Sequence, residues 1–413
     1  MSKYYLKSII GEIAKGVERL IAETTICNNQ KYLIYGLDRN AFAIRTILDN
    51  LGYNNIEGYI SEDEDLVLKF QQDIVNFSCK FLNGDEQLIN VYTISQRLDT
   101  FDNGAKILIA SDEYLKIKNL LEEKGYVENK HFFKVYDFDF SSIDDVLGNG
   151  TLMTSQMMKD AEKNVLIYID ELCQKQGLQY WVCGGTLIGT MRHMGFIPWD
   201  DDIDIFMPWD DYHKLVGHFK ETEEYCIMGF GTSDENDFPD HFAKVGDKRF
   251  LIRENLGTVL RVFPLGLDIF PIMGLPDDKD ERELLFTKYK ELNRSMWQSF
   301  YANNGDVSVF PKFYKEQLKL MTTCDYKTSK YVGVLGSQYG SKDYCSKAAY
   351  DETLRYPFED IEVNVPVGYD ENLTNLHGSN WNQIPDKSKQ KTHHNFTAYD
   401  MGTTDAYNKY FKC

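Results

Sequence analysis

The chain has 413 residues, more than a single hydrophobic core usually supports, so two domains are expected. Its hydrophobic content of 43% and charged content of 26% are ordinary for a soluble globular protein. The net charge of −19 argues against a nucleic-acid partner, because a phosphate backbone requires clustered Lys and Arg. No apolar run approaches the roughly 20 residues that span a bilayer, so no transmembrane segment is expected.

Residues 1–28 are predicted to form an amphipathic helix. Apolar residues recur there at the spacing of one helical face: Ile9, Ile10, Ile13, Val17, Leu20 and Ile21. Such a face usually packs on a protein core, but it can also lie on a membrane surface, which leaves peripheral proximity to a membrane open. Charged residues interrupt the segment, unlike a secretory signal. The eight cysteines show no zinc-ligand spacing, and a cytoplasmic location with reduced thiols is expected.

Residues 29–140 alternate short apolar strands with helices. Strands are predicted at 31–35, 56–60, 105–110 and 132–135, and helices at 39–51 and 112–124. This alternation predicts a parallel α/β sheet, and the region resembles the Rossmann-like module that precedes some sugar-modifying enzymes. The turn at Gly36 has one glycine where a dinucleotide fingerprint has three, which argues against NAD. A structural or docking role without a ligand and a nucleotide or sugar site both stay open.

Residues 141–152 are rich in Gly, Ser and Asp and are predicted to be a linker, which places the second domain at 153–413. This domain is expected to open with a helix over 155–176 that stops at Gly177. The elements predicted after it are strands at 179–182 and 202–207, a helix from Pro208 to about Phe219, and a helix over 280–300.

A glycine turn and three acid residues carry the chemistry of the second domain. The turn Gly184-Gly185-Thr186 opens a short helix, where backbone N–H groups can bind phosphate oxygens. Asp202 and Asp204 alternate with isoleucines, so both carboxylates point to one face of a strand. Two like charges side by side favour a divalent cation, Mg²⁺ or Mn²⁺, whereas a solvated acidic loop would not need the alternation. Asp268 lies in a similar strand; if it adjoins the pair, it can complete the metal shell and accept a hydroxyl proton.

The run from Gly184 to Asp204 closely resembles the LicD family of the nucleotidyltransferase superfamily, a group that includes fukutin-related protein. The resemblance covers about residues 153–400. It continues at Leu267-Asp268-Ile269-Phe270-Pro271, at Tyr356-Pro357-Phe358-Glu359, at Val365 to Asp370, and at His377-Gly378 with Trp381 and Pro385. It implies an α+β nucleotidyltransferase-fold domain around a short mixed sheet, behind the Rossmann-like domain. The family usually has Tyr-Gly where this chain has His377-Gly378, a departure that affects donor or acceptor binding rather than the acid residues.

The resemblance implies transfer of a phospho-alcohol, such as phosphocholine or a polyol phosphate, from a CDP-linked donor to a sugar hydroxyl. The acceptor would be a glycan or lipid-linked sugar of lipopolysaccharide, teichoic acid or capsule biosynthesis. On this basis Asp202, Asp204 and Asp268 are predicted to be the catalytic and metal-binding residues. The glycine turn, Gly184 to Thr186, falls on the phosphate-contacting turn of the superfamily.

Three further residues are candidates for substrate binding. Arg192 lies between the glycine turn and the acid residues, so it can clamp a phosphate or form an ion pair with the neighbouring aspartates. Lys244 alternates like a strand residue that faces a cleft and is a candidate phosphate ligand. Trp381 is a candidate for stacking on a base or sugar. His393 and His394 lack the ligand spacing of a structural zinc site, which leaves a docking role near the substrate.

Two other classes of function stay open beside the metal-dependent phosphotransferase. An Asp-x-Asp motif also serves nucleotide-sugar glycosyltransferases, whose glycoside product would contain no phosphodiester. A catalytically silent binding or scaffolding subunit is a third class, against which the intact Asp202, Asp204 and Asp268 argue.

Overall fold

A computed structural model describes residues 5–72, 90–98, 104–136, 141–232, 240–256, 259–390 and 396–411. The pair His393 and His394, a docking candidate by sequence, lies outside these residues. None of the helices in the described ranges combines the length and apolar character that a bilayer crossing requires.

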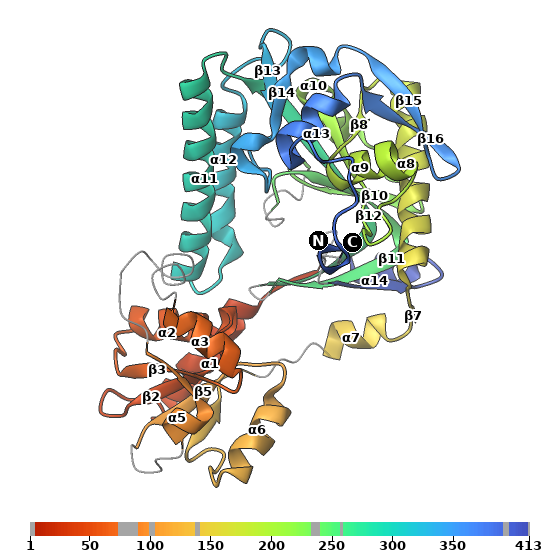
Figure 1. The fold of residues 1–413 in the computed structure, drawn as a ribbon. Coiled ribbons are helices and arrows are strands. Elements are labelled where there is room, and N and C mark those ends of the chain that lie inside the picture. The colour runs from red at the N-terminus through yellow and green to blue at the C-terminus, as the bar shows by residue number, and fades with distance from the viewer. Residues whose placement is uncertain are drawn as a thin grey trace.

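The N-terminal region contains a five-stranded, all-parallel sheet (Figure 1), as the alternating pattern predicted. Its strand order is β4-β3-β2-β5-β6. The strands are β2 (Tyr32–Tyr35), β3 (Ile56–Ser61), β4 (Val91–Thr93), β5 (Lys106–Ile109) and β6 (Phe132–Lys134). The helices beside them are α2 (Arg39–Asn50), α3 (Glu64–Gln72), α5 (Ile94–Leu98) and α6 (Tyr114–Glu123).

The first residues form two elements, so the single helix predicted for 1–28 is wrong in part. Strand β1 (Tyr5–Ser8) pairs antiparallel with β12 (Val259–Leu275), and helix α1 (Ile9–Ala22) follows it. The Ser8 hydroxyl accepts a hydrogen bond from the Gly11 N–H at 3.0 Å and caps the helix. The apolar face of α1 is buried in the main core, so it does not lie on a membrane surface. The pairing of β1 with β12 could not be predicted from local sequence patterns, because the two strands are far apart in the chain.

Apolar side chains cover both faces of the N-terminal sheet. Ile34 of β2 belongs to the core cluster that contains α1 and α2. The alternate residues Leu33 and Tyr35 pack in a second cluster with Ile117 and Leu121 of α6. The first cluster continues into β12 and into α11 (Lys279–Ala302), so one core connects this region with the rest of the chain.

The segment 141–152, predicted to be a linker, is largely regular structure. It forms α7 (Ser141–Leu147) and β7 (Thr151–Leu152), which pairs with β17 (Phe396–Asp400). Three apolar residues in this polar stretch, Ile143, Val146 and Leu147, are buried, while the domain boundary placed here stays a prediction. An ion pair of Asp144 with Arg253, 3.0 Å between Oδ1 and Nε, also ties α7 to the large sheet.

The second sheet is mixed and has ten strands within the described residues, so it is larger than the short sheet expected. Its main strand order is β14-β13-β12-β11-β17-β7. Strand β12 pairs with β11 antiparallel and with β9 in parallel. The strands not yet given are β8 (Trp181–Val182), β9 (Asp204–Pro208), β10 (Tyr225–Gly229), β11 (Ala243–Asn255), β13 (Tyr331–Gly333) and β14 (Tyr344–Ser346). A separate hairpin consists of β15 (Thr353–Phe358) and β16 (Ile361–Pro366).

Helices flank the large sheet (Figure 1). Helix α8 spans Ser155–Gln176 and ends at Gly177, whose φ of +67° is the left-handed conformation of a glycine cap, as predicted. The remaining helices are α9 (Gly184–His193), α10 (Trp209–His218), α12 (Phe310–Met321), α13 (Tyr369–His377) and α14 (Asp405–Tyr410).

Candidate active site

Helix α9 begins at the glycine turn and presents its N-terminus to a cavity. Gly184 has a φ of +53°, a conformation that strains other residues, and a Cβ atom on Gly185 would collide with the Asp200 carboxylate. The N-cap residue Cys183 makes no side-chain hydrogen bond to the first turn. The first N–H groups of α9 have no intrahelical acceptor, so they can bind an anion.

Strand β9 places an acid residue beside this turn. The Asp204 backbone N–H donates to Thr186 Oγ1 at 2.9 Å, which fixes the start of β9 against α9. Asp204 is the direct neighbour of Asp268 on β12, and Asp268 in turn neighbours Lys244 on β11. The Lys244 ammonium forms an ion pair with the Asp268 carboxylate. We call Asp204, Asp268 and Lys244 the charged row; it crosses three strands.

The carboxylates of the charged row repel one another in a buried environment. Burial raises the pKa of Asp204 well above its ordinary value, and the charges of Asp202 and Asp268 raise it further. Burial also raises the pKa of Asp268, to about 6, against the lowering effect of Lys244. The pKa of Glu162, buried on α8, is raised by burial and by the same aspartates. Binding of a proton or a cation to such a site is favourable, because it reduces the repulsion between the carboxylates.

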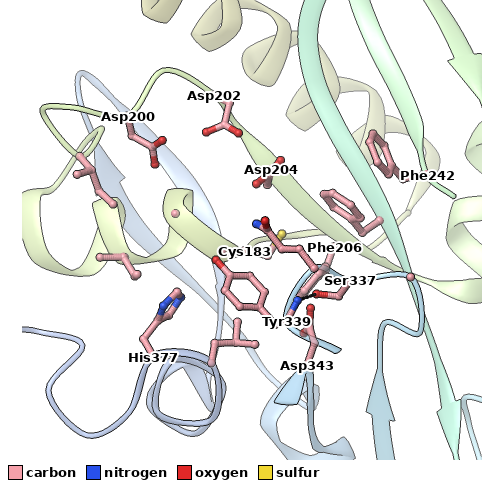
Figure 2. A pocket seen from close by; sticks show the side chains of 18 of the residues that line it. Cys183, Asp200, Asp202, Asp204, Phe206, Phe242, Ser337, Tyr339, Asp343 and His377 are labelled. Carbon is pink, nitrogen blue, oxygen red and sulfur yellow. Dashed lines mark hydrogen bonds between the residues drawn. The ribbon is translucent and has the colours of Figure 1, made fainter. Parts of the chain in front are cut away.

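A cavity of about 430 Å³ lies at one end of the charged row; Asp204 belongs to its lining, and Asp268 and Lys244 do not. Asp200, Asp202 and Asp204 line it together with the glycine turn. Figure 2 shows Tyr339 and Asp343, from the connection between β13 and β14, on another side of the cavity, with a third element contributing the end of α13. The helix N-terminus and the carboxylates therefore face one space large enough for part of a nucleotide-linked substrate.

Four predicted binding residues lie outside the lining of this cavity and contact other protein groups. Thr186 accepts the hydrogen bond from β9, and Lys244 pairs with Asp268. Arg192 Nη1 donates to the backbone carbonyl of Trp381 at 3.0 Å. The indole N–H of Trp381 donates to an Asp370 carboxylate oxygen at 3.0 Å. In this structure Arg192 and Trp381 hold the segment after α13, and their contacts with substrate stay predictions.

Several cavity residues were absent from the candidates found by sequence. Phe206 and Phe270 follow Asp204 and Asp268 by two positions, so strand alternation alone could have placed them on the cavity face. Tyr339 and Asp343, by contrast, lie in an irregular connection with no periodic pattern. His377, the departure from the family pattern, also lines the cavity and contacts the Tyr339 ring edge-on.

The acid residues have the oxygen ligands that Mg²⁺ or Mn²⁺ prefers. Within the described ranges, no three or more His, Cys, Asp or Glu side chains are arranged to hold a metal ion as they stand. Asp268 is engaged by Lys244. Strand β9 begins at Asp204 and not at 202 as predicted, so Asp202 lies in the loop before it; both residues line the cavity. One or two carboxylates with substrate phosphates is a common Mg²⁺ site, so this pair fits a cation completed by the donor. The third ligand, Asp268, stays a prediction.

Comparison with known proteins agrees with this geometry. Residues 177–329 match the family model for the LicD/FKTN/FKRP nucleotidyltransferase domain. The chain is 31% identical over 253 residues to the lipopolysaccharide cholinephosphotransferase LicD of Haemophilus influenzae, covering 57% of this chain and 94% of that protein. It is 39% identical over 44 residues to the ribitol 5-phosphate transferase FKRP of Homo sapiens, covering 11% of this chain and 9% of that protein. An uncharacterized protein of Rickettsia prowazekii is 41% identical over 90 residues, 22% of this chain and 30% of that protein.

The matched model classes the region around the charged row as a nucleotidyltransferase domain. Because the alignment spans nearly the whole Haemophilus protein at 31% identity, the chain belongs to the LicD family. The resemblance found in the motifs is thereby confirmed, and with it the enzyme class, a transferase of substituted phosphate groups.

Proposed function

We propose that this protein transfers a phospho-alcohol from a CDP-linked donor to a hydroxyl of a glycan or its lipid-linked precursor. The observation that carries the proposal is the pairing of Asp204 with Asp268 on adjacent strands, beside Asp202 and the N-terminus of α9. Two relatives support it, since one is a cholinephosphotransferase and the other a ribitol 5-phosphate transferase. Both names describe transfer of an alcohol together with its phosphate.

The proposed reaction makes and breaks one bond at phosphorus. The acceptor hydroxyl oxygen forms a bond to the phosphorus that carries the alcohol. The bond from that phosphorus to the bridging oxygen of the diphosphate breaks, and CMP leaves with its electron pair. The hydroxyl proton passes to a carboxylate, and we assign this role to Asp268, because it is the direct neighbour of Asp204 on the adjacent strand.

The glycine turn and the acid residues of the cavity are proposed to bind the phosphates and the cation. The N–H groups at the start of α9 would bind and orient phosphate oxygens. Asp202 and Asp204 would hold Mg²⁺ or Mn²⁺, and the bound cation would neutralise charge on the diphosphate. The Lys244 ammonium holds the Asp268 carboxylate in place from the neighbouring strand.

An Asp204→Asn variant tests the proposal directly. The purified protein is incubated with CDP-choline or CDP-ribitol, a sugar acceptor and Mn²⁺, and CMP release is measured. We expect a loss on the order of a hundredfold or more, because several kcal/mol of charge stabilisation disappear. Asp360→Asn is the matched control, since Asp360 lies on the surface with its side chain 76% exposed.

The identity of the product separates this function from its alternatives. A phosphodiester signal of the product in ³¹P NMR supports phospho-alcohol transfer, whereas a glycoside without phosphorus indicates a nucleotide-sugar glycosyltransferase. Wild-type protein that releases CMP from neither donor with Mg²⁺ or Mn²⁺, or Asp204→Asn with full turnover, would contradict the proposal.

A further inference from the structure

The loop between α9 and β9 carries acid residues of the cavity but contains no helix or strand. It spans residues 194–203, and its Asp200 and Asp202 line the cavity (Figure 2). We call this segment the acid loop. Its end is fixed to the large sheet, because the Asp268 N–H donates to the Ile203 carbonyl at 3.0 Å. The start and the middle of the loop are held by side chains from two other elements.

The turn of the β15–β16 hairpin holds the start of the acid loop. The Glu359 N–H donates to the Met194 carbonyl at 2.7 Å. One oxygen of the Glu359 carboxylate, Oε1, accepts a hydrogen bond from the Phe196 N–H at 3.0 Å. Gly195 allows this close approach, because a Cβ atom there would collide with the carboxylate. A single residue of the hairpin therefore binds backbone groups on both sides of Gly195.

The backbone at this contact has a costly conformation in both segments. Met194 has a φ of +56° and Glu359 a φ of +54°, both in the left-handed region. Glu359 is the first of the two residues between Phe358 and Ile361, a turn position that favours glycine when φ is positive. Such a conformation persists only where the surrounding structure holds it. The contacts of its carboxylate give a reason for a glutamate at this position.

A buried lysine of α8 holds the middle of the acid loop. Lys159 is 8% exposed, and its ammonium donates to the carbonyls of Ile197 at 3.3 Å and Pro198 at 3.2 Å. The ammonium also lies 5.3 Å from the centroid of the Phe196 ring. Within the part of the chain that the structure describes, no carboxylate forms an ion pair with it. A buried ammonium must replace its lost water with hydrogen bonds, and here the backbone of the acid loop supplies them.

We propose that Lys159 and Glu359 are positioning residues, which hold the acid loop in the conformation that directs Asp200 and Asp202 to the cavity. Neither residue lines the cavity itself. This inference rests on the proposed function, in which Asp202 binds the cation. When the hydrogen bonds to the loop are removed, the loop gains other conformations, and a smaller fraction of molecules presents Asp202 to the cation.

Binding of Mn²⁺ to purified variants tests the inference without turnover. Mn²⁺ affinity is measured by calorimetry, with the protein alone and with CDP present, and circular dichroism gives the folded fraction. We expect Lys159→Met and Glu359→Ala each to weaken Mn²⁺ binding by about tenfold, as is typical for groups that orient metal ligands. Glu359→Gln should bind Mn²⁺ as the wild type does, because its amide oxygen can still accept from the Phe196 N–H.

Two variants serve as matched controls. Asp360 is the second residue of the same turn, but its side chain is 76% exposed and pairs with Lys163 on α8. Lys175 lies on α8, as Lys159 does, but is exposed. Asp360→Ala and Lys175→Met should both keep the Mn²⁺ affinity of the wild type.

The Glu359 variants decide the outcome if the loss of the buried lysine unfolds the protein. A folded Lys159→Met or Glu359→Ala variant with wild-type Mn²⁺ affinity overturns the inference, while the proposed function stands. Equal weakening by Glu359→Ala and Glu359→Gln also overturns it, because the charge and not the hydrogen bond would then matter. A wild-type protein that binds no Mn²⁺, alone or with CDP, overturns the cation site on which both proposals rest.

Discussion

In the N-terminal sheet helices and apolar side chains cover both faces, whereas one face of the large sheet opens onto the cavity. Every residue of β2 is buried. Along β12, by contrast, Leu267 and Ile269 are buried while Asp268 and Phe270 are partly exposed. Asp204 and Phe270 line that cavity. Any ligand of the N-terminal sheet would have to bind at its strand ends, as in other parallel sheets.

If the N-terminal sheet has only a structural role, a substitution in its core should lower stability without changing the turnover of the folded protein. Ile34→Ala removes a fully buried side chain from its central strand, and we expect a cost of about 4 kcal/mol in the free energy of unfolding. The kcat for CMP release, corrected for the folded fraction, should be unchanged. Urea unfolding followed by circular dichroism and the CMP assay measure the two quantities.

Leu115→Ala is the matched control for this experiment, because Leu115 lies in the same region on α6 and is 74% exposed. It should change neither quantity. A fall in kcat for Ile34→Ala beyond the folded fraction would contradict the contrast between the two sheets and would indicate that the N-terminal region acts on the site.

Local patterns predicted the features that depend on neighbouring residues in the chain. The apolar run at 31–35 identified strand β2, and the glycine at 177 identified the end of α8. Alternation also separated Asp268 from the buried Leu267 and Ile269, and Asp268 neighbours Asp204 in the structure. The pairing of β1 with β12 and the position of Asp343 depend on contacts between distant segments, for which a single sequence holds no pattern.

The ion pair of the charged row can be tested separately by replacing Lys244. Lys244→Met removes the partner of Asp268 and leaves a largely buried carboxylate uncompensated, which we expect to cost about 3 kcal/mol of stability. The double variant Lys244→Met with Asp268→Asn should recover most of this loss, because it removes both charges. Unfolding in urea measures each variant, and the four proteins form a double-mutant cycle.

Lys327→Met provides the surface counterpart, since Lys327 forms an ion pair with Asp210 while 71% exposed. Its expected effect is below about 1 kcal/mol. If the losses of stability for Lys244→Met and Asp268→Asn were additive, the two side chains would have no measurable interaction energy. That result would contradict an ion pair within the charged row.

The last effect we expect is a change in the pH dependence of stability caused by Asp343. Its pKa is about 7 in the folded protein and about 3.9 in the unfolded chain, so the folded state holds this proton more tightly. Its contribution is fully present below about pH 4 and is lost as the pH rises to about 7. Asp343→Asn stays neutral, so its unfolding midpoint should fall less over that interval than that of the wild type. Midpoints in urea across this range, with chelator present, give the difference curve. Asp204, Asp268 and Glu162 contribute to both proteins and cancel in that curve, so parallel profiles would show that Asp343 does not titrate between these limits.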